Sequence, residues 1–419
     1  MFLNHNSTNG CYQLQLTIQG VPKIVTIDDY FPMKRNRFAF ASSVKNEIWV
    51  PLIEKAWAKV NRSYAGTIAG IPSEALDALS QAPVITIVHR KFTEDIIFKR
   101  LVYADENKFV ICTNTSGNPE AEKVGLMPAH AYSLIQLYEY NGLRLLKLRN
   151  PWGGGEWTGD YSDKSALWTE ELKKFVDFQK KEDGIFFMTL KDFIRYFPCS
   201  YICKIKDNFT YDHKKVQQSD RESFTICKFT IDKPTDVTVS LHQKQVRFYH
   251  KVKNYKPCAA TIILAKYVNG KYEYIFSDFG ENELLHVEAG IIQPGEYHIF
   301  SNVNWTYSNQ CNYVISTYAN NPFSLEELKD VPQDYLQQTL ISLLNKHVDS
   351  PPMFHNDLFK TSFNDNNTGF YLFYYKNNSN VKEVNVNFTI TYNSKIDFKT
   401  NIQVQRNEER VEGKVETTD

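Results

Sequence analysis

The stretch LRNPWGGGEWTG, residues 148–159, decides the fold. It ends a run of aliphatic and basic residues with an asparagine, a proline and a tryptophan, and three glycines, a glutamate and a second tryptophan follow. This combination is too specific for an ordinary surface turn. The preceding segment 143–150 alternates like a β-strand and ends at Asn150. An amide at the end of a strand can orient a catalytic group, so its partner should lie on a neighbouring strand.

The segment AHAYSLIQLYEY, residues 129–140, is the preceding strand and carries His130 between two small alanines. The dipeptide Asn141-Gly142 predicts a two-residue hairpin turn, which sets Tyr140 opposite Leu143. With that turn alone, His130 and Asn150 would lie on opposite faces of the sheet, because one register step moves every side chain to the other face. If the two residues act together, an odd-length connection or a bulge must override the turn.

A histidine and an asparagine in this relation fit thiol proteolysis. A thiolate attacks the peptide carbonyl, the imidazole carries the proton to the leaving amine, and an amide oxygen on the other ring nitrogen fixes the tautomer. Asparagine suits an ion pair of thiolate and imidazolium because it orients the ring without adding charge.

Length and composition indicate a protein of several domains. The chain has 419 residues, and at roughly 100–200 residues a domain this predicts two to four domains. Aromatic residues make up 14% of the chain, which favours well-packed, β-rich domains. Lys plus Arg and Asp plus Glu are balanced at 48 each, so no overall field attracts nucleic acid or an anionic membrane.

The cysteines argue for a reduced, cytoplasmic protein. They are scattered, without a CxxC pair, so they indicate neither a disulfide framework nor a zinc site. No leader pattern opens the sequence, and no apolar run approaches the ~18 residues of a transmembrane helix. The seven cysteines are Cys11, Cys112, Cys199, Cys203, Cys227, Cys258 and Cys311.

Residues 1–206 read as an α+β region in two parts. The first part, 1–83, contains an expected hairpin over 11–28 and expected helices over 45–60 and 71–83. The second part, 84–206, alternates strand and helix patterns and carries His130 and Asn150. Apolar residues then thin out over 207–222, which predicts a linker.

Residues from 223 onward are predicted to be almost entirely β. Short alternating strands over 223–320 indicate an antiparallel β-sandwich. A helix is expected over 324–347, followed by a partial second β module over 353–404. The charged residues 405–419 predict a solvated tail.

Several motifs, in order, resemble the protease core of the calpain family, which are papain-like cysteine endopeptidases activated by calcium. The second half of that core is similar to AHAYS at 129–133, LRNPWG at 148–153, EWTG at 156–159 and EDGIFFM at 182–188. The first half resembles NGCY at 9–12, VTIDDYFP at 25–32 and the segment 46–59. The resemblance implies an incomplete papain-like core followed by calpain-type β-sandwich domains over 223–320 and, in part, 353–404.

The resemblance also implies roles for individual residues. His130 would be the general base and acid, Asn150 would orient it, and Trp152 would shelter their hydrogen bond beside the cleft. The calcium site of the second half would use Glu156, Asp163, the carbonyl of Lys181 and Asp183, weakened because Ile185 occupies its remaining carboxylate position. Glu47 matches a calcium ligand of the first half.

The nucleophile is absent from the sequence as printed. Calpains carry it in a Gln-x-x-Gly-Asp-Cys-Trp stretch at the start of a helix, and no such stretch occurs here. Cys11 leads into a strand, Cys112 lies in another, and the remaining cysteines follow the His–Asn pair. We therefore expect the chain as written to be inactive, either as an incomplete piece of a calcium-dependent endopeptidase or as a non-catalytic relative that binds calcium, lipid or protein.

The expected partners follow from the same resemblance. Calpains act on extended regions of protein substrates. Anionic lipid is a further candidate through basic residues of the predicted sandwich, and nucleic acid is not expected. These basic residues are Lys228, Lys244, Arg247, Lys251 and Lys253.

Overall fold

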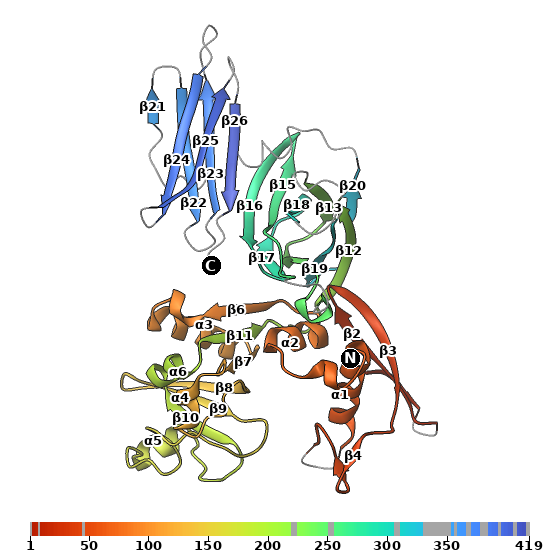
Figure 1. The fold of residues 1–419 in the computed structure, drawn as a ribbon, viewed down its shortest axis with the longest axis vertical. Helices are drawn as coiled ribbons and strands as arrows, with labels where there is room; N and C mark the ends of the chain where they lie inside the picture. Colours follow the sequence, from red (N-terminus) through yellow and green to blue (C-terminus); the bar gives the residue numbers. More distant parts are fainter. Residues whose placement is uncertain are drawn as a thin grey trace. The chain divides into compact units, whose positions relative to one another are not determined.

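The computed structural model forms two compact units, Met1–Asn208 and Phe209–Asp419 (Figure 1). It describes residues 2–6, 9–43, 47–218, 224–249, 255–305 and 311–329, and after them the strand segments 353–355, 358–365, 370–377, 384–392, 395–404 and 409–415. Among these residues no helix is long and apolar enough to span a bilayer.

The first unit begins with an antiparallel sheet of β1 (Phe2–Asn6), β2 (Cys11–Ile18) and β3 (Val21–Asp28). The predicted hairpin is confirmed, because Ile18 pairs with Val21 and the turn residues Gln19 and Gly20 both have positive φ. Helix α1 (Trp49–Val60) packs on this sheet, and Lys59 Nζ donates to the Thr26 carbonyl at 2.6 Å. The short strands β4 (Met33–Lys34) and β5 (Arg37–Phe38) connect them.

A six-stranded antiparallel sheet forms the rest of the first unit, in the order β10-β9-β8-β7-β11-β6. The last strand in sequence, β11, pairs with both β6 and β7, so the sheet is complete only when the chain has reached residue 203. The strands are β6 (Val84–Val88), β7 (Val110–Asn114), β8 (Ala131–Tyr140), β9 (Leu143–Arg149), β10 (Ile185–Thr189) and β11 (Cys199–Cys203).

Helices α3 (Glu94–Glu106) and α6 (Leu190–Tyr196) pack on the six-stranded sheet around one apolar core, and α5 (Glu170–Phe175) contributes to a second. Thr93 caps α3 by accepting from the Ile96 N–H, and two acidic residues follow in the first turn, where the helix dipole favours negative charge. The core joins α3 and α6 to the strands through Phe98, Leu101, Tyr132, Leu148 and Phe193. The elements are α2 (Pro72–Ser80), α3 (Glu94–Glu106), α4 (Pro119–Glu122), α5 (Glu170–Phe175), α6 (Leu190–Tyr196) and the 3-10 turns η1 (Ala65–Thr67) and η2 (His89–Lys91).

The hairpin of β8 and β9 contains both a two-residue turn and a bulge. The two-residue turn forms, because Tyr140 pairs with Leu143 across Asn141 and Gly142. The register then shifts between Leu134 and Gln136, where Ile135 is an extra residue on β8. This bulge moves the outer part of β8 by one step, so His130 and Asn150 come to the same face.

The second unit begins with two antiparallel sheets, of order β12-β19-β14-β17 and β16-β15-β18-β13-β20. Alternate side chains of both sheets meet in one core, with Val239 and Ile315 from one sheet and Ile262 and Ile299 from the other. The elements are β12 (Thr210–Gln218), β13 (Thr225–Ile231), β14 (Thr235–His242), η3 (Val246–Tyr249), β15 (Ala260–Val268), β16 (Lys271–Gly280), β17 (Leu284–Ile292), β18 (Gly295–Val303), β19 (Cys311–Ala319) and β20 (Glu326–Leu328).

Six further strands follow, and four of them form one sheet of order β21-β22-β23-β26, while β24 pairs with β25. The strands are β21 (Met353–His355), β22 (Leu358–Asp365), β23 (Phe370–Asn377), β24 (Val384–Tyr392), β25 (Lys395–Val404) and β26 (Glu409–Val415). Within the predicted solvated tail over 405–419, residues 409–415 form strand β26, which pairs with β23 along its whole length. Main-chain pairing forms this strand despite its charged sequence.

Two expectations need correction. The predicted linker over 207–222 contains β12, an edge strand that pairs with β19 and buries only two of its side chains, Val216 and Gln218. Its polar composition hid a strand whose stability comes from main-chain hydrogen bonds. The helix expected over 324–347 is replaced by strand β20 at Glu326–Leu328, and residues 330–347 lie outside the described part.

Asp77 on α2 generates a prediction about pH. Burial raises the pKa of this carboxyl from 3.8 to about 7. The unfolded chain therefore loses the proton at lower pH than the folded protein, so stability falls as the pH rises from about 4 to about 7. Asp77→Asn should raise the free energy of unfolding by about 1–3 kcal/mol at pH 8 and change it little at pH 4.

Urea unfolding followed by circular dichroism at the two pH values measures this difference. Asp160→Asn, at an exposed position, is the matched control and should have no effect at either pH. An equal gain from Asp77→Asn at pH 4 and pH 8 would contradict the assigned cause.

Candidate functional site

The backbone of His130 is held by Thr115, which follows β7. The His130 N–H donates to Thr115 Oγ1 at 3.2 Å, and the His130 carbonyl accepts from the Thr115 N–H at 3.2 Å. Thr115 is fully buried, and its hydroxyl donates to the Met127 carbonyl at 2.7 Å. His130 is thereby fixed on both sides of its Cα, directly after Ala129, which has a φ of 50°.

Tyr132 supports the same segment from the core. Its hydroxyl accepts from the Met127 N–H at 2.7 Å, and its ring lies edge-on to the His130 imidazole with 5.0 Å between centroids. Tyr132 is 1% exposed, and burial raises the pKa of its phenol. The Tyr132 ring therefore gives the imidazole a buried, apolar contact on one side.

Asn150 is completely buried and uses both ends of its amide. Its Nδ2 donates to the carbonyls of Gly154 at 2.5 Å and Gly155 at 3.1 Å. Its Oδ1 accepts from the Trp152 N–H at 3.0 Å and lies 2.8 Å from His130 Nε2. Since two carbonyls face Nδ2 and a backbone donor faces Oδ1, the amide cannot be turned over without losing these bonds.

This arrangement fixes the tautomer of the neutral imidazole. Asn150 Oδ1 is an acceptor, so His130 Nε2 must carry the proton that it donates. The lone pair of neutral His130 then lies on Nδ1, away from Asn150. The imidazole can accept a proton at Nδ1 while Nε2 stays bound, which is the requirement for a general base with a fixed orientation.

Trp152 covers the imidazole on one side. The rings of His130 and Trp152 are 4.1 Å apart between centroids and inclined by 42°. The indole is 67% exposed, so it is not packed in an apolar core. Trp152 lies in the turn after β9, and its N–H donates to Asn150 Oδ1 at 3.0 Å, which keeps the indole beside the His130–Asn150 pair.

The acidic residues expected to bind calcium lie close enough to influence one another. Glu156 Oε1 accepts from the Gly184 N–H at 2.8 Å, and Asp183 Oδ1 accepts from the Ile185 N–H at 3.0 Å. The pKa values of Glu156 and Asp163 are both raised, mainly by burial and further by the negative charge of Asp183. Lys180 and Lys164 act against this repulsion at Asp163.

These acids do not form a complete metal-binding group in the structure. Among the described residues, no three side chains of His, Cys, Asp or Glu converge as metal ligands. The Lys181 carbonyl accepts from the Asp183 N–H at 3.0 Å. Glu47, expected in a first-half site, instead accepts from the Trp49 indole at 3.1 Å and the Ser43 hydroxyl at 3.2 Å.

The cysteines of the six-stranded sheet are poor nucleophiles. Burial raises the pKa of Cys112 to about 11, and it also raises the pKa values of Cys199 and Cys203. Cys11 lies at the start of β2. In the part of the chain that the structure describes, the side-chain neighbours recorded for His130 are Asn150, Tyr132 and Trp152, and none is a thiol.

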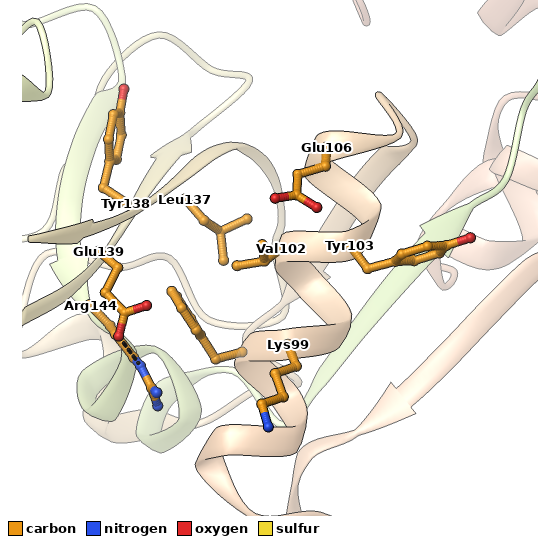
Figure 2. A pocket seen from close by; sticks show the side chains of 9 residues that line it. Lys99, Val102, Tyr103, Glu106, Leu137, Tyr138, Glu139 and Arg144 are labelled. Carbon is orange, nitrogen blue, oxygen red and sulfur yellow. Dashed lines mark hydrogen bonds and ion pairs between the residues drawn. The ribbon is translucent and has the colours of Figure 1, made fainter. Parts of the chain in front are cut away.

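A separate pocket of about 340 Å³ lies between α3 and the β8–β9 hairpin (Figure 2). Glu106 and Val102 lie on the α3 side, and Leu137 and Tyr138 lie on the strand side. Leu137 follows His130 by seven residues on a strand, which places the pocket roughly 20 Å from the imidazole. It is therefore not part of the His–Asn site.

Sequence reasoning found the side chains of the site but missed the groups that hold them. The strand pattern of 129–140 predicts Tyr132 on the same face as His130, but no pattern predicts the contacts of Thr115 and Gly184. A signal existed for Gly184, since glycine after two acidic residues is a common position for a left-handed backbone, and its φ is 84°. No local signal marks Thr115, which lies fifteen residues before His130.

The amide of Asn150 generates a prediction. Asn150→Asp would place a carboxylate oxygen against the carbonyls of Gly154 and Gly155, where Nδ2 now donates. The free energy of unfolding at pH 7 should fall by about 1–3 kcal/mol, the usual cost of an unsatisfied buried group. Urea unfolding at pH 7 measures the change.

Asn141→Asp, in the exposed turn of the same hairpin, is the matched control and should stay within about 0.5 kcal/mol of the parent. Equal stability of Asn150→Asp and the parent would show that the amide is not held as described.

Comparisons with known proteins point to one family for the first unit. A family model described as calpain family cysteine protease matches residues 2–204. Calpain-7 of Homo sapiens is 34% identical over 207 residues, which is 46% of this chain and 26% of calpain-7. Calpain-14 of Homo sapiens is 35% identical over 189 residues, which is 43% of this chain and 28% of calpain-14.

The calpain-type cysteine protease DEK1 of Zea mays is 32% identical over 208 residues, which is 47% of this chain and 10% of that protein. The chain thus spans only between 10% and 28% of the length of these three relatives. Among solved structures, a Yersinia pseudotuberculosis-derived mitogen aligns with a TM-score of 0.20 at 15% identity, over 30% of this chain and 97% of the mitogen, too low to inform the fold. Through residues 2–204, the chain belongs to the calpain family of cysteine proteases.

Proposed function

We propose that the chain carries the histidine–asparagine half of a calpain-like cysteine endopeptidase. The observation that supports this most strongly is the 2.8 Å contact between His130 Nε2 and Asn150 Oδ1, with Asn150 wholly buried. The thiol would come from a Gln-x-x-Gly-Asp-Cys-Trp segment that the printed sequence does not contain. The alternative of a calcium-, lipid- or protein-binding relative has no comparable observation in its favour.

The proposed reaction uses His130 at Nδ1. Neutral His130 takes the thiol proton at Nδ1, which gives a thiolate and an imidazolium whose Nε2–H still donates to Asn150. The thiolate attacks the scissile carbonyl carbon, and Nδ1–H then protonates the departing amine. Water, deprotonated at Nδ1, hydrolyses the acyl-enzyme and releases the carboxylate product and the thiol.

The neutral amide and the exposed indole support this reaction in different ways. Asn150 holds the ring through both protonation states without adding a negative charge that would favour imidazolium over the neutral base. Trp152 covers the ring beside the His130–Asn150 hydrogen bond, and water excluded from that side cannot compete for Nε2–H.

We also propose the finer architecture that the family implies. The six-stranded unit would be the second half of a papain-like core, and residues 210–329 would form a calpain-type β-sandwich. Protein substrates would bind in extended regions, in the cytoplasm. Anionic lipid is a weaker candidate partner, because Lys228 pairs with Glu326 at 3.4 Å. Lys251 and Lys253 lie outside the described residues.

A chimera tests the catalytic proposal. Residues 2–204 would be joined behind a calpain segment that carries the Gln-x-x-Gly-Asp-Cys-Trp stretch, and casein cleavage would be measured with calcium. We expect cleavage that a thiol-directed inhibitor abolishes. His130→Ala should lower kcat/KM by about 10⁴-fold and Asn150→Ala by about 10²-fold, the range of general base catalysis.

The unmodified chain, assayed in parallel, should not cleave casein. The histidine control is His89, which is buried and hydrogen-bonded to the Ser200 hydroxyl at 2.8 Å. His89→Gln should leave kcat/KM of the folded chimera within a few fold. Activity that survives His130→Ala would refute the proposed role of the half-site.

Weak calcium binding at Glu156, Asp163 and Asp183 is a second part of the proposal. The mutual repulsion of these acids supports it, since a divalent cation relieves such repulsion, and carboxylates and carbonyls are the ligands that calcium prefers. The lack of a converged ligand group among the described residues and the replacement of a further carboxylate by Ile185 argue for low affinity. A bound calcium ion would neutralise this acidic segment.

A Kd of about 10⁻⁴–10⁻³ M is expected. At about 10 mM calcium, the free energy of unfolding should then rise by about 1–3 kcal/mol. Asp163→Asn should abolish the rise, whereas Glu182→Gln, an exposed neighbour, should preserve it. Thermal unfolding with calcium, with magnesium and with a chelator measures these effects, and a rise that persists in Asp163→Asn would place the ion elsewhere.

A further inference from the structure

The peptide of Gly184 connects the acidic segment to the buried amide. Its N–H donates to Glu156 Oε1 at 2.8 Å, and its carbonyl accepts from the Asn150 N–H at 2.8 Å. The carboxylate of Glu156 thus binds the N–H of Gly184, and the backbone N–H of Asn150 binds its carbonyl.

The close approach of Gly184 to Asn150 requires glycine. Its φ is 84°, and a Cβ at this position would lie 2.6 Å from the Asn150 carbonyl oxygen and 3.0 Å from the Gly153 Cα. Glycine cannot fix its own orientation by side-chain packing. The hydrogen bond from Gly184 to Glu156 adds a constraint to the bond that its carbonyl makes with Asn150.

The contacts form a closed ring that begins and ends at Asn150. The Asn150 N–H reaches the Gly184 carbonyl, the Gly184 N–H reaches Glu156, and Glu156 follows Gly155, whose carbonyl accepts from Asn150 Nδ2. Removing the Glu156 acceptor opens the ring and leaves the Gly184 N–H unsatisfied. The loss of this constraint would then move Asn150 Oδ1. The hydrogen bond that keeps the proton on His130 Nε2 would weaken as a result.

We infer that Glu156 is a positioning residue for the His130–Asn150 pair in the calcium-free protein, acting through the Gly184 peptide. The inference rests on the proposed function, in which that pair is catalytic. In this role Glu156 must present an accepting oxygen at the distance that a glutamate side chain spans. The role does not depend on a bound ion.

The test is nuclear magnetic resonance of the full chain, ¹⁵N-labelled at histidine and held in a chelator. The His130 signals are assigned from their loss in His130→Gln. In the parent, Nε2 should carry a slowly exchanging proton and Nδ1 should show the shift of an unprotonated nitrogen. Glu156→Gln keeps an accepting Oε1 and should preserve this spectrum.

Glu156→Ala should speed exchange of the Nε2 proton about tenfold and move both ¹⁵N shifts toward a mixture of tautomers. Glu156→Asp keeps the charge but shortens the reach, and it should behave like Glu156→Ala, so it serves if the alanine variant does not fold. Glu182→Ala, in the same acidic turn, is the control and should resemble the parent.

Three results would overturn the inference. These are a parent-like spectrum in folded Glu156→Ala or Glu156→Asp, an altered spectrum in Glu156→Gln, and an equal change in Glu182→Ala. None of these measurements uses turnover, so they are independent of the casein assay on the chimera. An inactive chimera with the expected spectra would reject the proposed function and leave the positioning role supported.

Discussion

The complete burial of the Asn150 amide is the constraint on which the site depends. A buried amide without water must find protein partners for both its donors and its acceptor. Asn150 finds them in Gly154 and Gly155 on one side and in Trp152 and His130 on the other. The glycine-rich loop is therefore part of the site, because it exposes the carbonyls that fix which end of the amide meets the histidine.

The bulge at Ile135 brings His130 to the face of the hairpin on which Asn150 lies. Without it, the two-residue turn at Asn141-Gly142 would direct His130 and Asn150 to opposite faces of the hairpin. One extra residue on β8 corrects the register while the turn is kept. The two-residue turn and a common face for His130 and Asn150 are then compatible. One residue of β8, Ile135, is left without a partner in the ladder, and it is 40% exposed.

Much of the first unit could be predicted from sequence, because its hairpins and helices are local. The β2–β3 hairpin and α1 follow from alternating apolar residues and amphipathic spacing. The sequence also limited the His130–Asn150 pairing to two solutions, a longer connection or a bulge. It could not choose between them, since Ile135 is an ordinary strand residue and its displacement depends on the neighbouring strand. Strands β12 and β26 were missed for a related reason, as main-chain pairing with distant strands forms them.

The groups that hold the half-site all lie within one stretch of chain. Thr115, Met127 and Tyr132 hold His130, and the groups that hold Asn150 extend only to Gly184. Among the described residues, the hydrogen bonds that orient the imidazole therefore come from the stretch 115–184. The thiols of the sheet, by contrast, are partly or fully buried, and burial raises their pKa values, which makes them poor nucleophiles. In the proposed enzyme, a complementary segment would supply the thiol and the oxyanion donors, and His130 would receive the proton at Nδ1.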